Sequence, residues 1–198
     1  MKKFFYPVFL PYKGGLPFSE RALSVMICGN KYSTTPGELY STRRNIIIKY
    51  FLDKTDDFSL YGTGWEDSQF PCYKGQIPYK YEVLKNYKFN FCLENIQGQK
   101  GYVTEKIFDA FEAGCIPIYL GSSNISDYIP DNCYVDFSKF ESMDELLSFM
   151  EKFTEEEYNQ YIMNIKAFLI SEKAQKFSED VYVKIMTQEI VSLLEKKN

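Results

Sequence analysis

The sequence predicts an α/β fold with a mostly parallel sheet, because short apolar runs alternate with segments of helical periodicity. Residues 116–120 are apolar throughout, as expected of a strand that is covered on both faces of its sheet. The 198 residues, 45% of them hydrophobic and 25% charged, are enough for one domain with a sizeable core, and they exclude a disordered chain.

Five apolar runs that end near turn residues are the expected strands. They cover residues 23–28, 58–61, 88–93, 116–120 and 133–136. Gly29-Asn30 follows the first run, and Gly62-Thr63-Gly64 follows the second. Ligands of parallel sheets bind beyond the carboxyl ends of the strands, so the loops after these runs are where we expect a site.

The helices of the first half are predicted from their ends. Thr35-Pro36-Gly37-Glu38 has the spacing of a helix start, with a Thr cap, a Pro next and a Glu three residues after the cap. A short helix is expected over residues 81–87, and a longer one from Thr104 to Gly114, where a glycine can end it. The first helix would place these residues along one face: Tyr40, Arg44, Ile47, Ile48 and Phe51.

Three amphipathic helices are expected near the carboxyl terminus. Ser142 and Glu145 form one capping box, and Thr154 and Glu157 form a second. The last helix covers residues 178–196. The apolar faces fit three roles equally well: covering the sheet, docking on another domain, or forming a dimer.

The composition excludes several kinds of chemistry. The absence of histidine removes a Ser-His-Asp triad, a His-ligated zinc and a His general base. No Asp-x-Asp motif occurs, and we expect neither a metal nor another cofactor. Neither a P-loop nor a dinucleotide-binding glycine motif is present. The net charge of −4 gives no basic excess for binding nucleic acid.

The cysteines and the amino-terminal segment predict a cytoplasmic protein, with peripheral attachment to a membrane as an alternative. The five cysteines are odd in number and include no CxxC, which favours buried thiols in a reducing compartment. Pro7 and Pro11 interrupt the short apolar run at the start, and no signal-peptide cleavage site follows. No stretch approaches the roughly 20 apolar residues of an integral membrane segment.

Two cations stand at positions that structure alone does not require. Lys106 falls in the first turn of the helix that begins after Thr104, where a cation is unfavourable unless an anion binds there too. Arg44 lies on an apolar helix face, and its planar fork suits phosphate. A solvated lysine and an arginine at the edge of the core explain the same residues almost as well, and Arg43 is an alternative to Arg44.

Three segments resemble the signature of the family-10 α-1,3/1,4-fucosyltransferases. They are YKFNFCLEN at 87–95, GYVTEKI at 101–107 and AGCIPIYLG at 113–121, in the order and spacing of that family's motifs. Residues 41–51 resemble its arginine-bearing helix, and residues 60–65 resemble its Gly-rich turn. The likeness covers residues 24–150.

The resemblance implies the Rossmann-like donor half of a GT-B glycosyltransferase, which transfers L-fucose from GDP-fucose to a hydroxyl of a glycan acceptor with inversion. By position, Lys106 and Arg44 (or Arg43) would hold the pyrophosphate, Tyr102 and Glu105 would contact sugar portions of the donor, and Asn95 would line the nucleotide pocket. The expected catalytic residues are Glu105, Lys106 and Arg44. The expected donor-binding residues are Arg43, Arg44, Asn95, Tyr102, Thr104, Glu105 and Lys106, and no residue is expected to bind a metal.

One departure from the family bears on domain organisation. Members have an amino-terminal acceptor domain that supplies the base, and residues 1–22 are too few to form one. We expect residues 1–22 to be a short extension or a remnant of it, residues 23–150 to be the donor-binding domain, and residues 151–198 to be a helical segment packed on that domain. The acceptor-binding domain would then be missing or separate. The alternatives are a GDP-fucose-binding module without autonomous catalysis and a non-enzymatic interaction protein.

Overall fold

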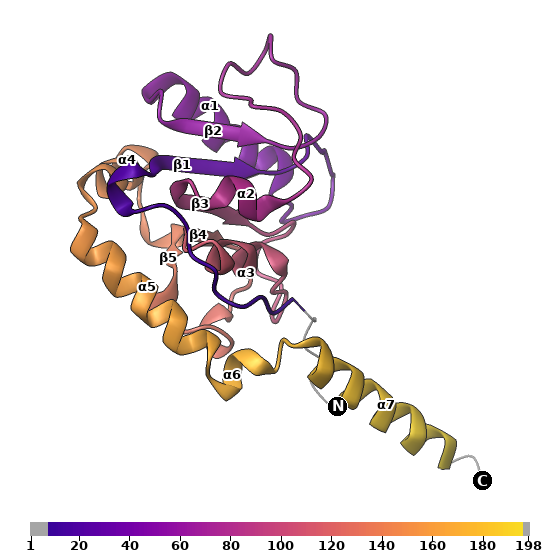
Figure 1. The fold of residues 1–198 in the computed structure, drawn as a ribbon. Coiled ribbons are helices and arrows are strands. Elements are labelled where there is room, and N and C mark those ends of the chain that lie inside the picture. The colour runs from indigo at the N-terminus through magenta and orange to yellow at the C-terminus, as the bar shows by residue number, and fades with distance from the viewer. Residues whose placement is uncertain (1–7, 196–198) are drawn as a thin grey trace.

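Five parallel strands form a single sheet in the computed structural model, which describes residues 8–195 (Figure 1). The strands are β1 (Ala22–Ile27), β2 (Phe58–Tyr61), β3 (Tyr87–Leu93), β4 (Ile116–Leu120) and β5 (Val135–Asp136). Their order across the sheet is β2-β1-β3-β4-β5, and every neighbouring pair is parallel. This is a doubly wound, Rossmann-like arrangement, and it confirms the predicted fold class.

Helices cover both faces of the sheet. They are α1 (Asn45–Lys54), α2 (Lys80–Leu84), α3 (Glu105–Glu112), α4 (Met143–Lys152), α5 (Glu155–Leu169), α6 (Glu172–Gln175) and α7 (Glu179–Glu195). A π-helix, η2 (Tyr40–Arg44), precedes α1, and short 3-10 turns are η1 (Phe18–Glu20), η3 (Ile125–Asp127), η4 (Asp131–Cys133) and η5 (Phe137–Lys139).

The side chains of β3 show which helices cover which face. Phe91 packs on Phe51 of α1, with ring centroids 5.0 Å apart, and Phe89 packs on Phe153 at the end of α4, at 5.1 Å. Cys92 points to the other face, because side chains alternate along a strand, and its thiol contacts the Lys106 carbonyl of α3 at 3.3 Å. All five residues of β4 are buried, as predicted for a strand covered on both sides.

The prediction that a helix begins at Thr35 is wrong. Residues 35–37 form a turn, in which Gly37 takes a φ of +82°, a backbone conformation that a helix cannot contain. Glu38 forms a bridge with Ile96, and its carboxylate accepts hydrogen bonds from the backbone N–H groups of Tyr40 and Ser41. The glutamate itself therefore caps the helical segment that starts at Tyr40, in the role that was assigned to Thr35.

The other helix and strand ends lie closer to their predicted positions. The short helix is Lys80–Leu84 rather than 81–87, because Tyr87 already belongs to β3. The last strand is shorter than 133–136, because Cys133 closes a 3-10 turn with Pro130. Gly114 ends α3 with a φ of +62°, as predicted. The Thr154–Glu157 capping box is present, whereas Glu145 bonds to the Glu141 N–H instead of completing the box with Ser142.

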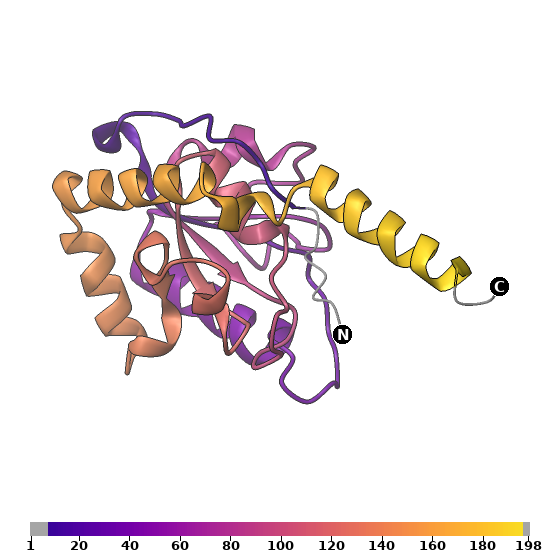
Figure 2. The ribbon, with the colours of Figure 1, turned by 90° about the horizontal axis from the view of Figure 1, so that it is seen from below.

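The terminal segments behave differently from one another. Residues 8–21 pack on the sheet domain, where the buried Arg21 guanidinium donates to the carbonyls of Tyr87 and Ala113. Residues 1–7 and 196–198, at the ends of the predicted extension and the predicted last helix, lie outside the described residues. Of the carboxy-terminal helices, α5 packs on the domain, while α7 buries none of its residues and projects away from the body (Figure 2).

Candidate functional site

A pocket of about 390 Å³ opens at the carboxyl ends of β1, β2 and β3. The chain runs from β1 to β2 on one side and continues to β3 on the other, so this is the point where the strand order reverses, the usual ligand site of such sheets. Four cationic side chains line the pocket, and among the described residues Glu105 is the only carboxylate in this lining. The cations are Lys31, Arg44, Lys80 and Lys106. Glu94 and Asp109 pair with Lys106 and Lys80 from behind this lining, so four cations stand against three carboxylates and leave an excess of one positive charge, which favours an anionic ligand.

Arg44 is held at the pocket by the backbone of the neighbouring strand end. It is buried, and its Nη2 donates to the carbonyls of Leu93 and Glu94 at 2.9 and 3.0 Å and to Asn95 Oδ1 at 3.1 Å. The guanidinium carbon lies 4.6 Å from the centre of the Tyr40 ring. Arg43, the alternative from sequence, is exposed and does not line the pocket.

Arg44 faces inward at the end of the π-helical turn. The Arg44 N–H bonds to the Leu39 carbonyl, five residues earlier, so this turn contains one more residue than an α-helical turn. Arg44 then lies on the same buried face as Ile47, Ile48 and Phe51, which agrees with the predicted helical face.

Lys106 is oriented by a carboxylate that the sequence analysis did not single out. Its ammonium lies 3.1 Å from Glu94 Oε2 and 3.1 Å from Thr104 Oγ1. The Glu94 side chain is fully buried, and it also accepts hydrogen bonds from the Thr104 N–H at 2.9 Å and the Thr104 hydroxyl at 2.7 Å. Thr104 therefore precedes α3 as predicted, but Glu94, not the Thr104 side chain, satisfies the free N–H at this helix start.

A third cation, Lys80, joins the cluster from the start of α2. Its ammonium lies 2.6 Å from Asp109 and 3.4 Å from Glu105. Burial acts to lower the pKa of Lys80, but the Asp109 and Glu105 carboxylates outweigh it, so the pKa is raised overall. Burial acts to raise the pKa of Glu105, but the positive charges of Lys106 and Lys80 outweigh this effect. The pKa is therefore lowered overall, and the carboxyl is ionised at neutral pH.

Asn95 and Tyr102 are the remaining predicted residues, and of the two only Asn95 lines the pocket. The Asn95 Nδ2 donates to the Tyr102 hydroxyl at 3.2 Å, so both are linked to Arg44 through the Asn95 amide. The structure thus brings together Arg44, Asn95, Tyr102, Thr104, Glu105 and Lys106.

Lys31, Lys80 and Glu94 are charged residues of this site that sequence reasoning missed. Glu94 stands within the YKFNFCLEN segment, and its position at the end of a buried strand was the available signal. Lys80 carries no local signal, because its partners Glu105 and Asp109 are more than twenty residues away.

A smaller cavity of about 20 Å³ lies against the same cations. Asn90 lines it, is 5% exposed, and has no hydrogen-bond partner for its Oδ1. Cys28 lines both cavities, and burial raises the pKa of its thiol to about 11, so the thiol is protonated at neutral pH. Nucleophilic catalysis by this cysteine is therefore disfavoured.

No three Cys, Asp or Glu side chains within residues 8–195 are clustered as metal ligands would be. None of the helices described is both long and apolar enough to cross a bilayer.

A Rossmann-like sheet with a cation-lined pocket at its switch point is the arrangement in which α/β proteins commonly bind nucleotides, and the fold is that of the GT-B glycosyltransferases. The model of the family described as "Glycosyltransferase family 10 (fucosyltransferase) C-term" matches residues 37–195. The chain belongs to glycosyltransferase family 10.

Known relatives are fucosyltransferases. The α-(1,4)-fucosyltransferase of Arabidopsis thaliana is 39% identical over 81 residues, which are 40% of this chain and 20% of that protein. The α-(1,3)-fucosyltransferase FucT of Helicobacter pylori is 41% identical over 83 residues, which are 42% of this chain and 17% of that protein. The matched part therefore spans a fifth or less of either relative.

A solved structure shares the fold. The crystal structure of an α1,3-fucosyltransferase with GDP-fucose superposes with a TM-score of 0.52 at 23% identity. The match covers 85% of this chain and 47% of the solved one. The Rossmann-like half predicted from the sequence is thus confirmed.

Proposed function

We propose that this chain is the donor-binding half of a fucosyltransferase, in which the pocket over β1–β3 holds GDP-fucose for transfer of fucose to a glycan hydroxyl. The observation that carries the proposal is the convergence of Arg44, Lys80 and Lys106 on one pocket with a single carboxylate in its lining. A diphosphate supplies the negative charge that this arrangement lacks. The relatives' names and the GDP-fucose complex of a protein with this fold support the choice of nucleotide sugar.

The chemistry follows from where charge develops. In an inverting displacement, the acceptor hydroxyl oxygen forms a bond to the anomeric carbon as its proton passes to a base of the acceptor-binding part, while the bond from that carbon to the phosphate oxygen breaks. Negative charge grows on the departing GDP, and fixed cations beside it stabilise the transition state. We assign this role to Arg44 and Lys106, with Asn95 lining the nucleotide pocket and Tyr102 and Glu105 toward sugar portions of the donor. Arg43 lies outside the pocket, and we assign it no role.

We further propose that these side chains, rather than a metal, neutralise the diphosphate. Lys106, Lys80 and Glu105 already form a connected network, with Glu105 Oε1 3.4 Å from Lys80 and 3.8 Å from Lys106. GDP binding that is unchanged by EDTA would support this, and binding restored only by Mg²⁺ or Mn²⁺ would contradict it.

The first experiment is a calorimetric titration of the chain with GDP-fucose, using GDP-mannose and UDP-glucose as controls. Selective binding of GDP-fucose supports a working donor site. Binding of none of the three rejects the donor-site assignment for this chain.

A second candidate function is a GDP-fucose-binding module that does not catalyse transfer by itself. It is favoured by the state of Glu105, the only carboxylate in the pocket lining, whose lowered pKa makes it a weak base. The acceptor-binding part and its base would then come from a missing or separate domain. Turnover by this chain over a panel of glycan acceptors would reject the module, and binding without turnover would support it.

We also propose a cytoplasmic location, with peripheral membrane association as the alternative, and a role in making fucosylated lipopolysaccharide or glycoprotein. The five cysteines are all unpaired, which suits a reducing compartment. Fractionation of cells that express a tagged chain tests the location.

A further inference from the structure

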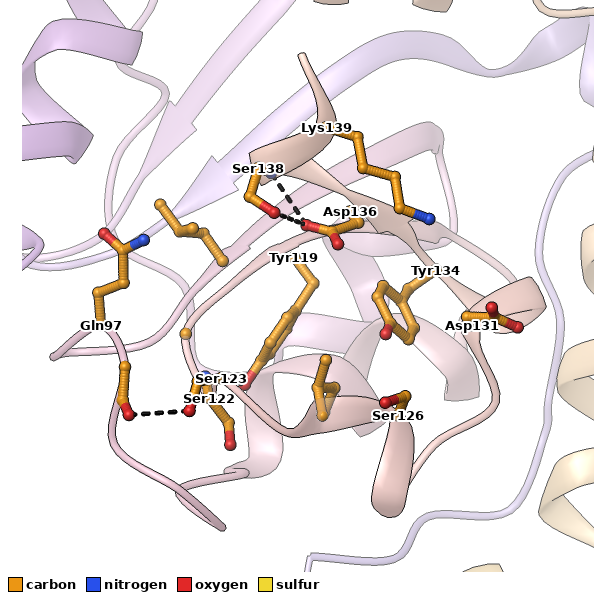
Figure 3. Close-up of a pocket in the computed structure, with 14 residues that line it drawn as sticks. Gln97, Tyr119, Ser122, Ser123, Ser126, Asp131, Tyr134, Asp136, Ser138 and Lys139 are labelled. Atoms are coloured by element: carbon orange, nitrogen blue, oxygen red, sulfur yellow. Dashed lines mark hydrogen bonds between the residues drawn. The ribbon is translucent and has the colours of Figure 1, made fainter. Parts of the chain in front are cut away.

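A second pocket, of about 430 Å³, lies at the same edge of the sheet beyond β4 and β5 (Figure 3). It shares no lining residue with the cation-lined pocket. The loop of residues 97–102 separates the two, and it is tied to the loop after β4 by four hydrogen bonds. These are Gly98 N to Gly121 O, Ser123 Oγ to Gly98 O, Gly101 N to Ser122 Oγ and Gly101 N to Asn124 Oδ1.

The chemistry of this second pocket differs from that of the first. Hydroxyl groups dominate its lining, from four serines and two tyrosines, with two aspartates and one lysine. Asp131 and Asp136 against Lys139 leave an excess of one negative charge, which disfavours a phosphate. Carboxylates and hydroxyls that can both accept hydrogen bonds suit a neutral ligand rich in O–H donors.

Tyr134 presents a free hydroxyl to the pocket. The residue is 4% exposed, its ring points into the pocket (Figure 3), and its hydroxyl forms no hydrogen bond with any described residue. The neighbouring Tyr119 differs, because its hydroxyl accepts from the Ser122 N–H at 3.0 Å and contacts the Tyr102 carbonyl at 3.4 Å. The hydroxyl opens onto the pocket rather than into the core, so a ligand bound there can take its hydrogen bond in place of water.

Other polar groups of the pocket are also free to form hydrogen bonds with a ligand. Asp136 uses one oxygen, Oδ1, to accept from the N–H and hydroxyl of Ser138, which leaves Oδ2 open. Asp131 and Ser126 have no side-chain hydrogen bond within residues 8–195. The two tyrosine rings, 5.8 Å apart and steeply inclined, add an apolar wall against which the C–H face of a sugar can pack.

We propose that this pocket binds a neutral sugar residue of the acceptor glycan, next to the donor site. The inference rests on the proposed function, since it takes the cation-lined pocket as the donor site. The separating loop and the absence of shared lining residues favour the acceptor over the fucose of the donor itself.

The test is saturation-transfer NMR on the full chain with methyl glycosides of galactose, glucose, N-acetylglucosamine and mannose, beside calorimetry with GDP and GDP-fucose. At least one glycoside should bind, and Tyr134→Phe should weaken it about fivefold, the effect of one neutral hydrogen bond. Tyr182→Phe, which removes a hydroxyl from α7, is the matched control and should change nothing. Ser126→Phe, which fills the pocket from an exposed turn, should abolish glycoside binding while GDP still binds.

Each other result overturns the inference in a distinct way. If GDP binds and no glycoside does, the sugar pocket is rejected while the donor site stands. If Tyr134→Phe weakens GDP, the pocket holds part of the nucleotide; if it weakens GDP-fucose alone, the pocket holds the donor's fucose. If neither GDP nor any glycoside binds, the proposed function fails as well.

Discussion

The two pockets lie on one edge of one parallel sheet, yet their side chains have opposite character. The pocket over β1–β3 gathers four cations around one carboxylate, whereas the pocket over β4 and β5 gathers hydroxyls, two carboxylates and a single lysine. The shared backbone geometry therefore fixes where ligands enter, and the loops that follow each strand determine what they are. Charged and neutral ligands would be kept apart by the loop of residues 97–102.

The largest expected effect is the loss of GDP binding when Arg44 is replaced. Arg44→Met should weaken GDP binding roughly 10- to 150-fold, because hydrogen bonds to charged groups contribute about 1.5–3 kcal/mol. Calorimetry measures the loss, and circular dichroism checks that the variant folds, since Arg44 also bonds to the Leu93 and Glu94 carbonyls. Arg43→Met is the matched control and should bind as the wild type does. Equal affinity in all three proteins would contradict the assignment.

Glu94→Gln tests whether the cation-lined pocket depends on a buried carboxylate. The amide oxygen still accepts from the Thr104 N–H, but the NH2 group that replaces Oε2 accepts neither from the Thr104 hydroxyl nor from the Lys106 ammonium. The free energy of unfolding should fall by about 1–3 kcal/mol in urea denaturation, the cost of losing a charged hydrogen bond in a buried site. The half-exposed Glu105, replaced by Gln, should cost clearly less. A Glu94 variant as stable as the wild type would show that Lys106 needs no partner.

Ligand binding at the two pockets should respond differently to salt. Raising the ionic strength from 0.1 to 1 M shortens the screening length from about 10 Å to about 3 Å, so GDP affinity should fall a few-fold. Binding of a neutral glycoside should not change, because its contacts involve no ligand charge. Parallel titrations at both salt concentrations make the measurement, and a glycoside that follows GDP would indicate one shared site.

The smallest expected effect is the contribution of Glu105 to stability at acidic pH. The pKa of Glu105 lies below its ordinary value of 4.5, so its ionised form adds stability above that pH, and this is lost as the pH falls through the lowered pKa. The melting temperature of the wild type should drop below pH 4.5, and Glu105→Gln should drop less. Parallel curves would mean that Lys80 and Lys106 do not act on this carboxyl in solution.

The strands were predictable because their signal is local. Phe58–Tyr61 was predicted at its observed bounds, and Ile116–Leu120 was recognised as buried from its apolar run alone. The Thr35 start failed because the bridge between Glu38 and Ile96 places that turn through a contact almost sixty residues away. Local capping rules contain no such information.

In the candidate site, too, features with a local sequence signal were predicted and features that depend on distant contacts were not. Lys106 and Arg44 were identified from cations at positions that local structure does not favour, and the structure places both in one pocket. The predicted helical face already contained Arg44, and the structure excludes Arg43 because it is exposed, whereas the π-helix was not indicated by the sequence pattern. Glu94 and Lys80 join the site only through the packing of α2 and α3 beside β3.

The contact between Glu94 and Lys106 has a consequence for the entropy of ligand binding. A free lysine loses up to about 2 kcal/mol of side-chain freedom when it is immobilised. Here Glu94 and Thr104 hold the ammonium in place before any ligand arrives, so that loss belongs to folding. An incoming diphosphate meets a cation that is already oriented, and more of the attraction between them remains as affinity.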